Sequence, residues 1–338
     1  MIAPPGRRTN LGLLVALVLT FATGMGALAA GSASGRWVVI CHGVAGLGVA
    51  LLAPWKAEIV RRGLQRARPS RWFSLLLAAL IVITLLTGLG SATGLVRSLA
   101  GRTSLWIHVA AALLAVPLVI WHVIARPARP RKTDLSRRSL LQAGAVGVAA
   151  AGVYVATNTA VRLAGLPGAD RRFTGSHETG SFVPDEMPNT SWLNDTSPAI
   201  DPDSWRLEVA DADDERELTL GELATFDDRL RAVLDCTGGW FAEQDWEGVL
   251  LSTLIRNAGD ARSLHARSAT GYGMRFPIQD TGRLLLATRV GGAPLSEGHG
   301  FPLRMVAPGR RGFWWVKWVD RIETQATPWW WQPPFPLT

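Results

Sequence analysis

Five long apolar runs restrict what this chain can fold into more than any other feature of its sequence. They lie at about 11–30, 37–55, 72–95, 105–125 and 140–160. A helix of about 20 apolar residues is long enough to cross the hydrocarbon core of a bilayer. The first run lacks a convincing cleavage site, so we interpret it as a span and not as a removable signal peptide. The runs predict a multi-span α-helical membrane bundle.

Basic residues flank these runs unevenly. Fourteen lysines and arginines lie on one side of the predicted membrane and three on the other. The fourteen are Arg7, Arg8, Lys56, Arg61, Arg62, Arg66, Arg68, Arg71, Arg126, Arg129, Arg131, Lys132, Arg137 and Arg138; the three are Arg36, Arg97 and Arg102. Because basic loops remain in the cytoplasm, the N-terminus is predicted to be cytoplasmic, and five spans place the C-terminal half outside. The net charge of +8 arises mostly from these flanks, so nucleic acid is not an expected partner.

The composition changes near residue 162, after which acids, prolines and tryptophans become common. The sequence predicts a four-span bundle at 1–135, a fifth span at 136–162, a linker at 163–190 and a soluble domain at 191–338. The start of the fifth span, Ser136-Arg137-Arg138, resembles a twin-arginine export signal. That interpretation places the chain in the cytoplasmic membrane of a prokaryote. Ordinary basic flanking is the alternative.

Three histidines lie within the spans. His42 and His108 are each a few residues from the outer end of a span, so two antiparallel helices could present both imidazoles to one haem b iron. His122 lies fourteen residues beyond His108, near the inner side, and is a further candidate haem ligand without a visible partner there. Histidines that hydrogen-bond between helices are the alternative. A haem in the bundle would exchange electrons with membrane quinone.

The C-terminal half alternates short strands with helical segments. Strands are predicted at 205–209, 231–234, 284–288 and 303–306, and helical segments at 218–226 and 249–257. This mixture predicts an α+β domain. Thr219 and Glu222 have the spacing of a capping box at the start of the first helix. No internal repeat is predicted in the chain.

Cys236 is the only cysteine outside the predicted membrane part. The apolar run 232–234 leads into it and a Gly-Gly turn follows, which is typical of a strand end that presents a side chain to a cavity. A thiolate there would be a nucleophile or a soft-metal ligand; a buried, inert cysteine is the alternative. The other cysteine, Cys41, lies in an apolar run, so no internal disulfide is expected.

The sequence HGFPLRMVAPG at 299–309, followed by VKW at 316–318, resembles the sulfite oxidase-like molybdopterin enzymes. In that family these two segments hold the cofactor, and one cysteine upstream binds molybdenum. The segments at 189–192, 200–202 and 205–207 are also similar to the family's first strand region. The resemblance covers about 182–323 and implies an α+β domain of the sulfite oxidase molybdopterin-binding fold.

The resemblance implies roles for individual residues. Cys236 would be the molybdenum ligand, and Trp240 would lie beside it at the catalytic centre. The residues that would bind molybdopterin are Asn189, Thr190, His299, Arg304, Gly309, Arg310, Arg311, Gly312 and Lys317, and Trp192 is expected to contact the cofactor through its main chain. Arg304 and Lys317 supply positive charge for the cofactor phosphate, and the backbone N–H groups of the turn at 309–312 could surround it. A solvated turn is the alternative for Arg310 and Arg311.

Two departures from true sulfite oxidases bear on the substrate. Phe241 stands where those enzymes have an anion-binding arginine, and Trp240 is similar to the methionine sulfoxide reductase branch of the family. We therefore expect oxygen-atom transfer on a small extracytoplasmic substrate, with a sulfoxide or N-oxide favoured over sulfite. The expected cofactors are molybdopterin with molybdenum and haem b.

The expected partners are the small-molecule substrate, membrane quinone, membrane lipid and a redox partner protein. Two alternatives remain open from the sequence. One is the same enzyme without haem, in which the bundle is only an anchor and quinone site. The other is a non-enzymatic electron-transfer or binding module with a degenerate molybdopterin fold.

Overall fold

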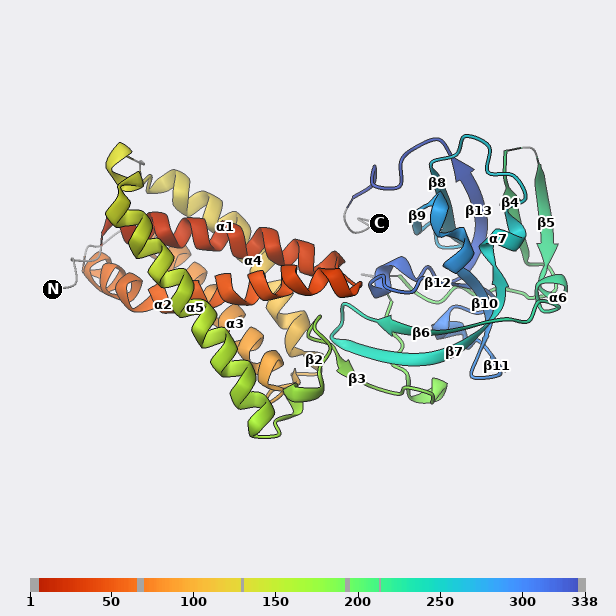
Figure 1. Ribbon diagram of the computed structural model, residues 1–338, viewed down its shortest axis with the longest axis horizontal. Helices are drawn as coiled ribbons and strands as arrows, with labels where there is room; N and C mark the ends of the chain where they lie inside the picture. Colours follow the sequence, from red (N-terminus) through yellow and green to blue (C-terminus); the bar gives the residue numbers. More distant parts are fainter. Residues whose placement is uncertain (1–5, 66–69, 129–130, 192–194, 213, 334–338) are drawn as a thin grey trace. The chain divides into compact units, whose positions relative to one another are not determined.

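The computed structural model describes residues 6–65, 70–128, 131–191, 195–212 and 214–333. The chain divides into two compact units, with the boundary between Gly175 and Ser176. The first unit is helical and the second is built mainly from β-strands (Figure 1).

Five long helices make up the first unit. They are α1 (Arg7–Ala29), α2 (Arg36–Leu64), α3 (Arg71–Thr93), α4 (Ser104–Ala125) and α5 (Arg137–Leu163). All five are long and apolar enough to cross a membrane, which agrees with the five predicted runs. The helices extend past the apolar runs because basic residues continue the first turns of α1, α2, α3 and α5. Many of their apolar side chains are exposed, as lipid-facing side chains would be.

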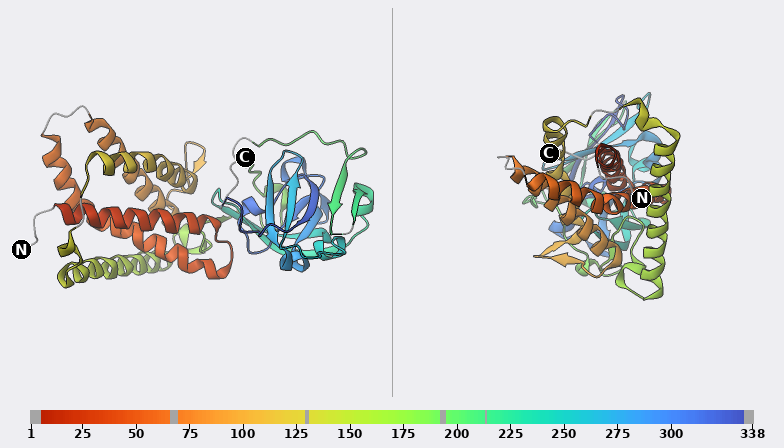
Figure 2. Two further views of the ribbon diagram at one scale, coloured as in Figure 1. Left: turned by 90° about the horizontal axis from the view of Figure 1, so that it is seen from above. Right: turned by 90° about the vertical axis from the view of Figure 1, so that its left-hand side faces the viewer.

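The first four helices form two hairpins. Helix α1 packs along α2, and α3 packs along α4, whereas contact between α2 and α3 is sparse (Figure 2). Helix α5 packs on α2. A short two-stranded turn, β1 (Ser98–Leu99) and β2 (Arg102–Thr103), joins α3 to α4.

The two hairpins contain an internal repeat, and the expectation of none was wrong. The sequence Thr-x-x-Thr-Gly-x-Gly occurs at 20–26 in α1 and again at 84–90 in α3. In both copies the second threonine donates its hydroxyl to the helix carbonyls three and four residues earlier. The repeat is short, and the remaining positions share only apolar character, so pattern alone does not reveal it.

The second unit contains two sheets. The first has strand order β11-β10-β7-β3, with β12 also paired to β10 and β6 to β7; the second has order β5-β4-β13-β8-β9. The strands are β3 (His177–Glu178), β4 (Arg206–Ala210), β5 (Glu215–Thr219), β6 (Asp228–Asp235), β7 (Trp240–Leu250), β8 (Ser263–Ser268), β9 (Gly273–Pro277), β10 (Leu285–Val290), β11 (Ala293–Pro294), β12 (Arg304–Val306) and β13 (Val319–Gln325). Pairing is antiparallel except between β4 and β13 and between β3 and β7. The domain is mixed α+β, as predicted.

Two predicted helical segments begin as strand and contain only one turn of helix each. Val249 and Leu250 end β7, and helix α7 covers only Leu251–Leu254. In the same way Leu218 and Thr219 belong to β5, and helix α6 covers only Leu220–Leu223. The capping box of Thr219 and Glu222 is present. Val249 pairs with Leu286 on β10. This cross-strand pairing keeps Val249 in a strand despite the helical spacing of the leucines that follow.

The segment predicted as linker, 163–190, is divided between the units. Its second part contains β3, which pairs with β7 and so belongs to the C-terminal unit. Alternating apolar residues are absent from this part, and the pairing depends on main-chain groups: the His177 N–H donates to the Gly239 carbonyl at 3.0 Å.

Candidate functional site

Cys236 lies in the tight turn between β6 and β7. The N–H of Cys236 donates to the Trp240 carbonyl at 2.9 Å, and the N–H of Gly239 donates to the Cys236 carbonyl at 3.2 Å. Gly239 has φ 93°, a conformation that favours glycine and explains the Gly-Gly pair. The thiol is buried and accepts a hydrogen bond from the Gly238 N–H at 3.3 Å. Burial raises the pKa of the Cys236 thiol, and the Gly238 N–H opposes this shift.

A buried ion pair stabilises the turn that carries Cys236. Arg311 donates to the Asp235 carboxylate at 2.7 Å and to the Cys236 carbonyl at 3.1 Å. Ser176 donates to the same carboxylate at 2.7 Å. Both charged side chains are only 2% exposed, so each charge depends on the other.

The thiol side of the turn faces a cavity of about 70 Å³. The cavity is lined by Pro188, Thr190, Ser191, Asp195, Leu234, Cys236, Thr237, Trp240, Ser268, Tyr272, His299, Arg304, Gly312, Phe313, Trp315, Lys317 and Trp318. These residues come from both sheets and from the loops between them, so the folded domain brings together segments that are distant in sequence. Five of the lining side chains are aromatic, two are basic (Arg304 and Lys317) and one is acidic (Asp195).

Arg304 is buried, Lys317 is half-buried, and the Asp195 carboxylate lines the same cavity. Arg304 is 3% exposed, lies over the rings of Trp246 and Trp315, and donates to the His299 carbonyl at 2.9 Å. Its Nε is buried without a partner among the described residues. Burial lowers the pKa of Arg304 to about 10.

Lys317 donates its Nζ hydrogens to the Asn189 side-chain oxygen at 2.9 Å and to the Gly298 carbonyl at 2.5 Å. Burial, followed by the charge of Arg304, lowers the pKa of Lys317 to about 7. Neither cation forms an ion pair with a carboxylate in the described part of the chain. An anion in the cavity would remove the cost of burying both charges.

Residues 194–331 match the family model of the oxidoreductase molybdopterin-binding domain. The C-terminal unit is a molybdopterin-binding oxidoreductase domain. This confirms the resemblance at the level of the domain and supports the expectation of an oxidoreductase enzyme over that of a non-enzymatic module.

Known proteins are similar to this domain over part of their length. Mitochondrial sulfite oxidase of Rattus norvegicus is 28% identical over 166 residues, which cover 38% of this chain and 30% of that protein. Inducible nitrate reductase (NADH) 2 of Glycine max is 36% identical over 95 residues, which cover 23% of this chain and 11% of that protein. The sulfane dehydrogenase SoxCD of Paracoccus pantotrophus superposes with a TM-score of 0.37 and 25% identity, covering 39% of this chain and 40% of that chain. The chain therefore spans less than a third of the sulfite oxidase that it matches.

The residues of the molybdopterin domain fit the cofactor in charge and in metal chemistry. Buried Arg304 and half-buried Lys317, neither ion-paired among the described residues, suit its phosphate, and the Cys236 thiol supplies a soft ligand. No group of three or more His, Cys, Asp or Glu among the described residues could hold a metal alone. The sulfurs of the pterin would have to supply the other ligands.

His299 lines the cavity, but both ring nitrogens have protein partners. Nε2 donates to the Met187 carbonyl at 2.9 Å, and Nδ1 accepts from the Ser296 hydroxyl at 2.8 Å. Burial and then the charge of Arg304 lower the pKa of His299, so the ring is neutral at pH 7. To hydrogen-bond to a pterin, His299 would have to give up its bond to Ser296 or its bond to Met187.

Asn189, Thr190 and Trp240 lie at this site together. Thr190 accepts a hydrogen bond from the Trp240 indole N–H at 3.1 Å and lies next to the Cys236 thiol. Asn189 is bonded to Lys317. Trp192 lies outside the described residues.

The turn at 309–312 differs from its predicted role. Arg310 donates to Asp280 at 3.1 Å and lies over the Trp314 ring, and Arg311 is bonded to Asp235. Neither side chain lines the cavity, and Gly309 does not line it either. Both carboxylate partners are far away in sequence, so no local pattern indicates them. Gly312 does line the cavity; a Cβ there would lie 3.0 Å from the Cys236 Cα, so the close approach requires glycine.

Phe241 lies elsewhere than the sequence comparison suggested, and Tyr272 was not assigned to the site from the sequence. Phe241 does not line the cavity, because alternate side chains of β7 point to opposite faces and Trp240 takes the cavity side. Tyr272, in contrast, lines the cavity and donates its hydroxyl to the Phe313 carbonyl. Burial raises the pKa of the Tyr272 hydroxyl well above its usual range.

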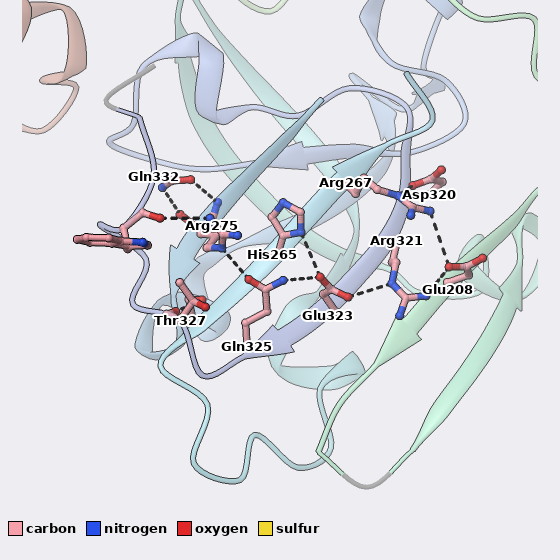
Figure 3. A network of polar contacts seen from close by, with 12 residues as sticks. Glu208, His265, Arg267, Arg275, Asp320, Arg321, Glu323, Gln325, Thr327 and Gln332 are labelled. Atoms are coloured by element: carbon pink, nitrogen blue, oxygen red, sulfur yellow. Dashed lines mark hydrogen bonds and ion pairs between the residues drawn. The ribbon is translucent and has the colours of Figure 1, made fainter. Parts of the chain in front are cut away.

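Arg275 lies away from the cavity, in a polar network across β9, β8 and β13 (Figure 3). There it donates to Gln325 at 2.6 Å, while Glu323 contacts His265 at 3.3 Å and accepts from Arg321 at 3.1 Å. Arg321 also bonds Glu208 on β4 at 2.6 Å. These contacts tie the strands of the second sheet together and have no direct link to Cys236.

The helical unit brings two of its three histidines together. His42 on α2 and His108 on α4 have ring centroids 5.8 Å apart at an interplanar angle of 87°. Their Nδ1 atoms bond to the carbonyls of Thr20 at 2.9 Å and Thr84 at 2.8 Å. This arrangement leaves each Nε2 available to a metal between the hairpins. His122 has no such partner, and its Nδ1 is buried without a hydrogen bond among the described residues.

Proposed function

We propose that this chain is a membrane-anchored molybdenum oxidoreductase. Its C-terminal domain transfers an oxygen atom to or from a small extracytoplasmic substrate, and its bundle exchanges electrons with quinone through a haem. The observation that carries the proposal is the cavity that combines the Cys236 thiol with the buried Arg304 and the half-buried Lys317, neither of which forms an ion pair among the described residues. Such a cavity suits a ligand that offers both a soft metal and a phosphate.

When bound, the cofactor supplies two-electron oxygen-atom transfer at molybdenum. The protein's own residues have distinct tasks in this proposal. Cys236 ligates the metal, and the Gly238 N–H supports its sulfur. Arg304 and Lys317 neutralise the phosphate, while Asn189, Thr190 and His299 fix the pterin edge. Trp240 and Tyr272 form aromatic walls that limit water around the reacting atoms.

The pairing of His42 with His108 supports a haem b in the bundle. Each ring comes from a different hairpin, contact between α2 and α3 is sparse, and each Nδ1 is already engaged by a carbonyl. Two imidazoles held in this way suit the two axial positions of a low-spin haem. His122 remains a weaker candidate for a second haem.

We place the protein in the cytoplasmic membrane of a prokaryote, with the C-terminal domain on the extracytoplasmic side. The distribution of basic residues supports this orientation. Arg137 and Arg138 begin helix α5, and their use as a twin-arginine export signal is part of the proposal. Lipid, quinone, the substrate and a redox partner protein are the proposed partners.

A neutral sulfoxide or N-oxide is the proposed substrate class, because five aromatic side chains line the cavity. A small oxyanion is the second candidate. The observation in its favour is that Arg304 and Lys317 line the same cavity as Cys236, and the relatives named above are a sulfite oxidase and a nitrate reductase. Turnover assays with methionine sulfoxide, trimethylamine N-oxide, sulfite and nitrate separate the two classes.

Metal and haem analysis of the detergent-purified full chain tests the proposal. We expect molybdenum and pterin in the wild type. Cys236→Ser should keep much of the pterin, because Arg304 and Lys317 remain, and should lose turnover. A wild type without molybdenum, or a Cys236→Ser variant with full turnover, would remove the assignment of Cys236.

The haem part has its own test. His42→Ala and His108→Ala should each remove the low-spin haem spectrum and quinol-linked turnover, because the iron loses an axial ligand. Turnover with a soluble artificial donor should survive in both variants. His122→Ala should change these properties less. An intact haem spectrum in His42→Ala with a lost spectrum in His122→Ala would contradict the proposed ligand pair.

A further inference from the structure

The repeated sequence Thr-x-x-Thr-Gly-x-Gly lies directly against the two facing histidines. In α1, the carbonyl of Thr20 accepts the bond from His42, and the residue four positions later is Gly24. In α3, the carbonyl of Thr84 accepts the bond from His108, and the residue four positions later is Gly88. Each ring therefore lies against the same two groups, a threonine carbonyl and the glycine four positions after it.

The glycine in each copy explains how a ring can reach a helix carbonyl. In an α-helix, a carbonyl points toward the residue four positions later, and a side chain there covers it. A Cβ at Gly24 would lie 3.0 Å from Cε1 and 3.2 Å from Nδ1 of His42. A Cβ at Gly88 would lie 3.0 Å from Nδ1 and 3.1 Å from Cε1 of His108. Both separations are too short for an unshifted ring.

The threonine one position before each glycine competes for the same carbonyl. The Thr23 hydroxyl divides its hydrogen between the Leu19 carbonyl at 2.6 Å and the Thr20 carbonyl at 3.2 Å. Thr87 does the same between Ile83 at 2.6 Å and Thr84 at 3.2 Å. Each of these carbonyls thus receives a ring N–H and a hydroxyl in addition to its helical N–H. The hydroxyl therefore weakens the hydrogen bond that the imidazole Nδ1–H makes to the same carbonyl.

We propose that Gly24 and Gly88 are positioning residues, and that each repeat is a socket that fixes the plane and the Nδ1–H bond of one haem-ligating histidine. This inference rests on the proposed haem between His42 and His108. The bond to Nδ1 fixes the tautomer, leaves the Nε2 lone pair for iron and makes the imidazole a stronger donor. The near-perpendicular ring planes follow from the directions of the two sockets.

Paired glycine variants of the full chain in detergent test the socket. Gly24→Ala and Gly88→Ala should retain haem, shift the largest g value of the ferric electron paramagnetic resonance spectrum, and raise the haem midpoint potential. The potential rises because a displaced ring loses its carbonyl bond and donates less strongly to ferric iron. Gly48→Ala is the matched control, because it lies in α2 with His42 and a Cβ there would meet nothing within 4 Å.

A second pair of variants adds no bulk and predicts the opposite sign. Thr23→Val and Thr87→Val remove the competing hydroxyl, strengthen the Nδ1–H bond and should lower the midpoint potential. If an alanine variant does not fold, the midpoint potentials of the two valine variants still test the proposal.

The outcomes separate the socket from the haem itself. A wild type without haem would overturn the proposed haem, and the socket with it. A wild type with haem, in which the glycine and threonine variants match Gly48→Ala in g values and potential, would overturn the socket alone.

Discussion

Two cations of the C-terminal domain differ in one respect that decides their role. Arg311 faces Asp235 at 2.7 Å with both side chains 2% exposed, whereas Lys317 is half-buried, bonds to neutral oxygens and has the Asp195 carboxylate in the same cavity but beyond ion-pair distance. Removing one member of a buried ion pair leaves an uncompensated charge, while a cation without an ion pair already carries part of that cost. The first residue therefore stabilises the turn that carries Cys236, and the second is available to an anion.

Asp235→Asn should lower the free energy of unfolding of the domain by about 3–5 kcal/mol, because Arg311 keeps its charge without a partner. Urea unfolding of the full chain in detergent, followed by tryptophan fluorescence, measures the change. Asp245→Asn is the matched control: it lies on the adjoining strand and pairs with Arg231 at the surface, at 2.8 Å. Equal effects of the two substitutions would argue against a structural role for the buried pair.

Lys317 should make the stability of the cofactor-free protein depend on pH. Its pKa is about 7 in the folded state and 10.5 in the unfolded state, so the unfolded chain binds more protons between these values. The free energy of unfolding should therefore rise as pH increases from 7 toward 10.5, and this contribution should level off below pH 7. Denaturation at pH 7, 8 and 9 measures the slope. Lys317→Met should reduce it, and a bound phosphate should do the same; an unchanged slope in Lys317→Met contradicts the assignment.

Strand pairing determines the secondary structure of the C-terminal domain more than the local spacing of apolar residues does. The sequence predicted the strands near 205–209, 231–234, 284–288 and 303–306 because short apolar runs end at turn residues there. It predicted a helix at 249–257 because three leucines have helical spacing, although Val249 pairs with Leu286 in the sheet. Residue patterns describe one segment at a time, and β7 is held mainly by its neighbours β6 and β10.

The same distinction separates the site residues that the sequence predicted from those it did not. The motif at 299–309 and the segment at 316–318 led to His299, Arg304 and Lys317, all of which line the cavity with Cys236. Tyr272 was not placed there, and Arg311 was given a different role. The partners of these two, Phe313 and Asp235, lie 41 and 76 residues away. Contacts over such separations exist only in the folded domain.

Gly248→Ala should disrupt the first sheet. A Cβ at Gly248 would lie 2.0 Å from the Leu286 carbonyl oxygen on β10, so the two strands would have to move apart. We expect a loss of about 1–3 kcal/mol in the free energy of unfolding, typical of overpacking. Gly282→Ala, at a position with nothing within 4 Å, serves as the control, and thermal unfolding compares the two. A Gly248→Ala variant as stable as Gly282→Ala would show that β7 and β10 tolerate the separation.

At the scale of the whole molecule, our proposal that all five apolar helices cross a membrane places the two ends of the chain on opposite sides of it. Trypsin added to intact spheroplasts should cut near Arg172, in the segment that follows α5, and should spare the basic loops at 56–71 and 126–138. Inverted vesicles should show the reverse. A C-terminal domain that is protected in spheroplasts and cut only in inverted vesicles would reverse the proposed orientation.

The parallel pairing of β4 with β13 also bears on the timing of synthesis. Strand β13 lies between β4 and β8 in the second sheet, yet the ribosome makes both neighbours first. During translation, β4 and β8 have no shared partner, so the sheet stays open until residues 319–325 leave the exit tunnel. The apolar helices, in contrast, can enter the bilayer as they emerge. If the helices insert as we propose, insertion begins before the cavity exists, and a cofactor could bind only after translation has passed β13.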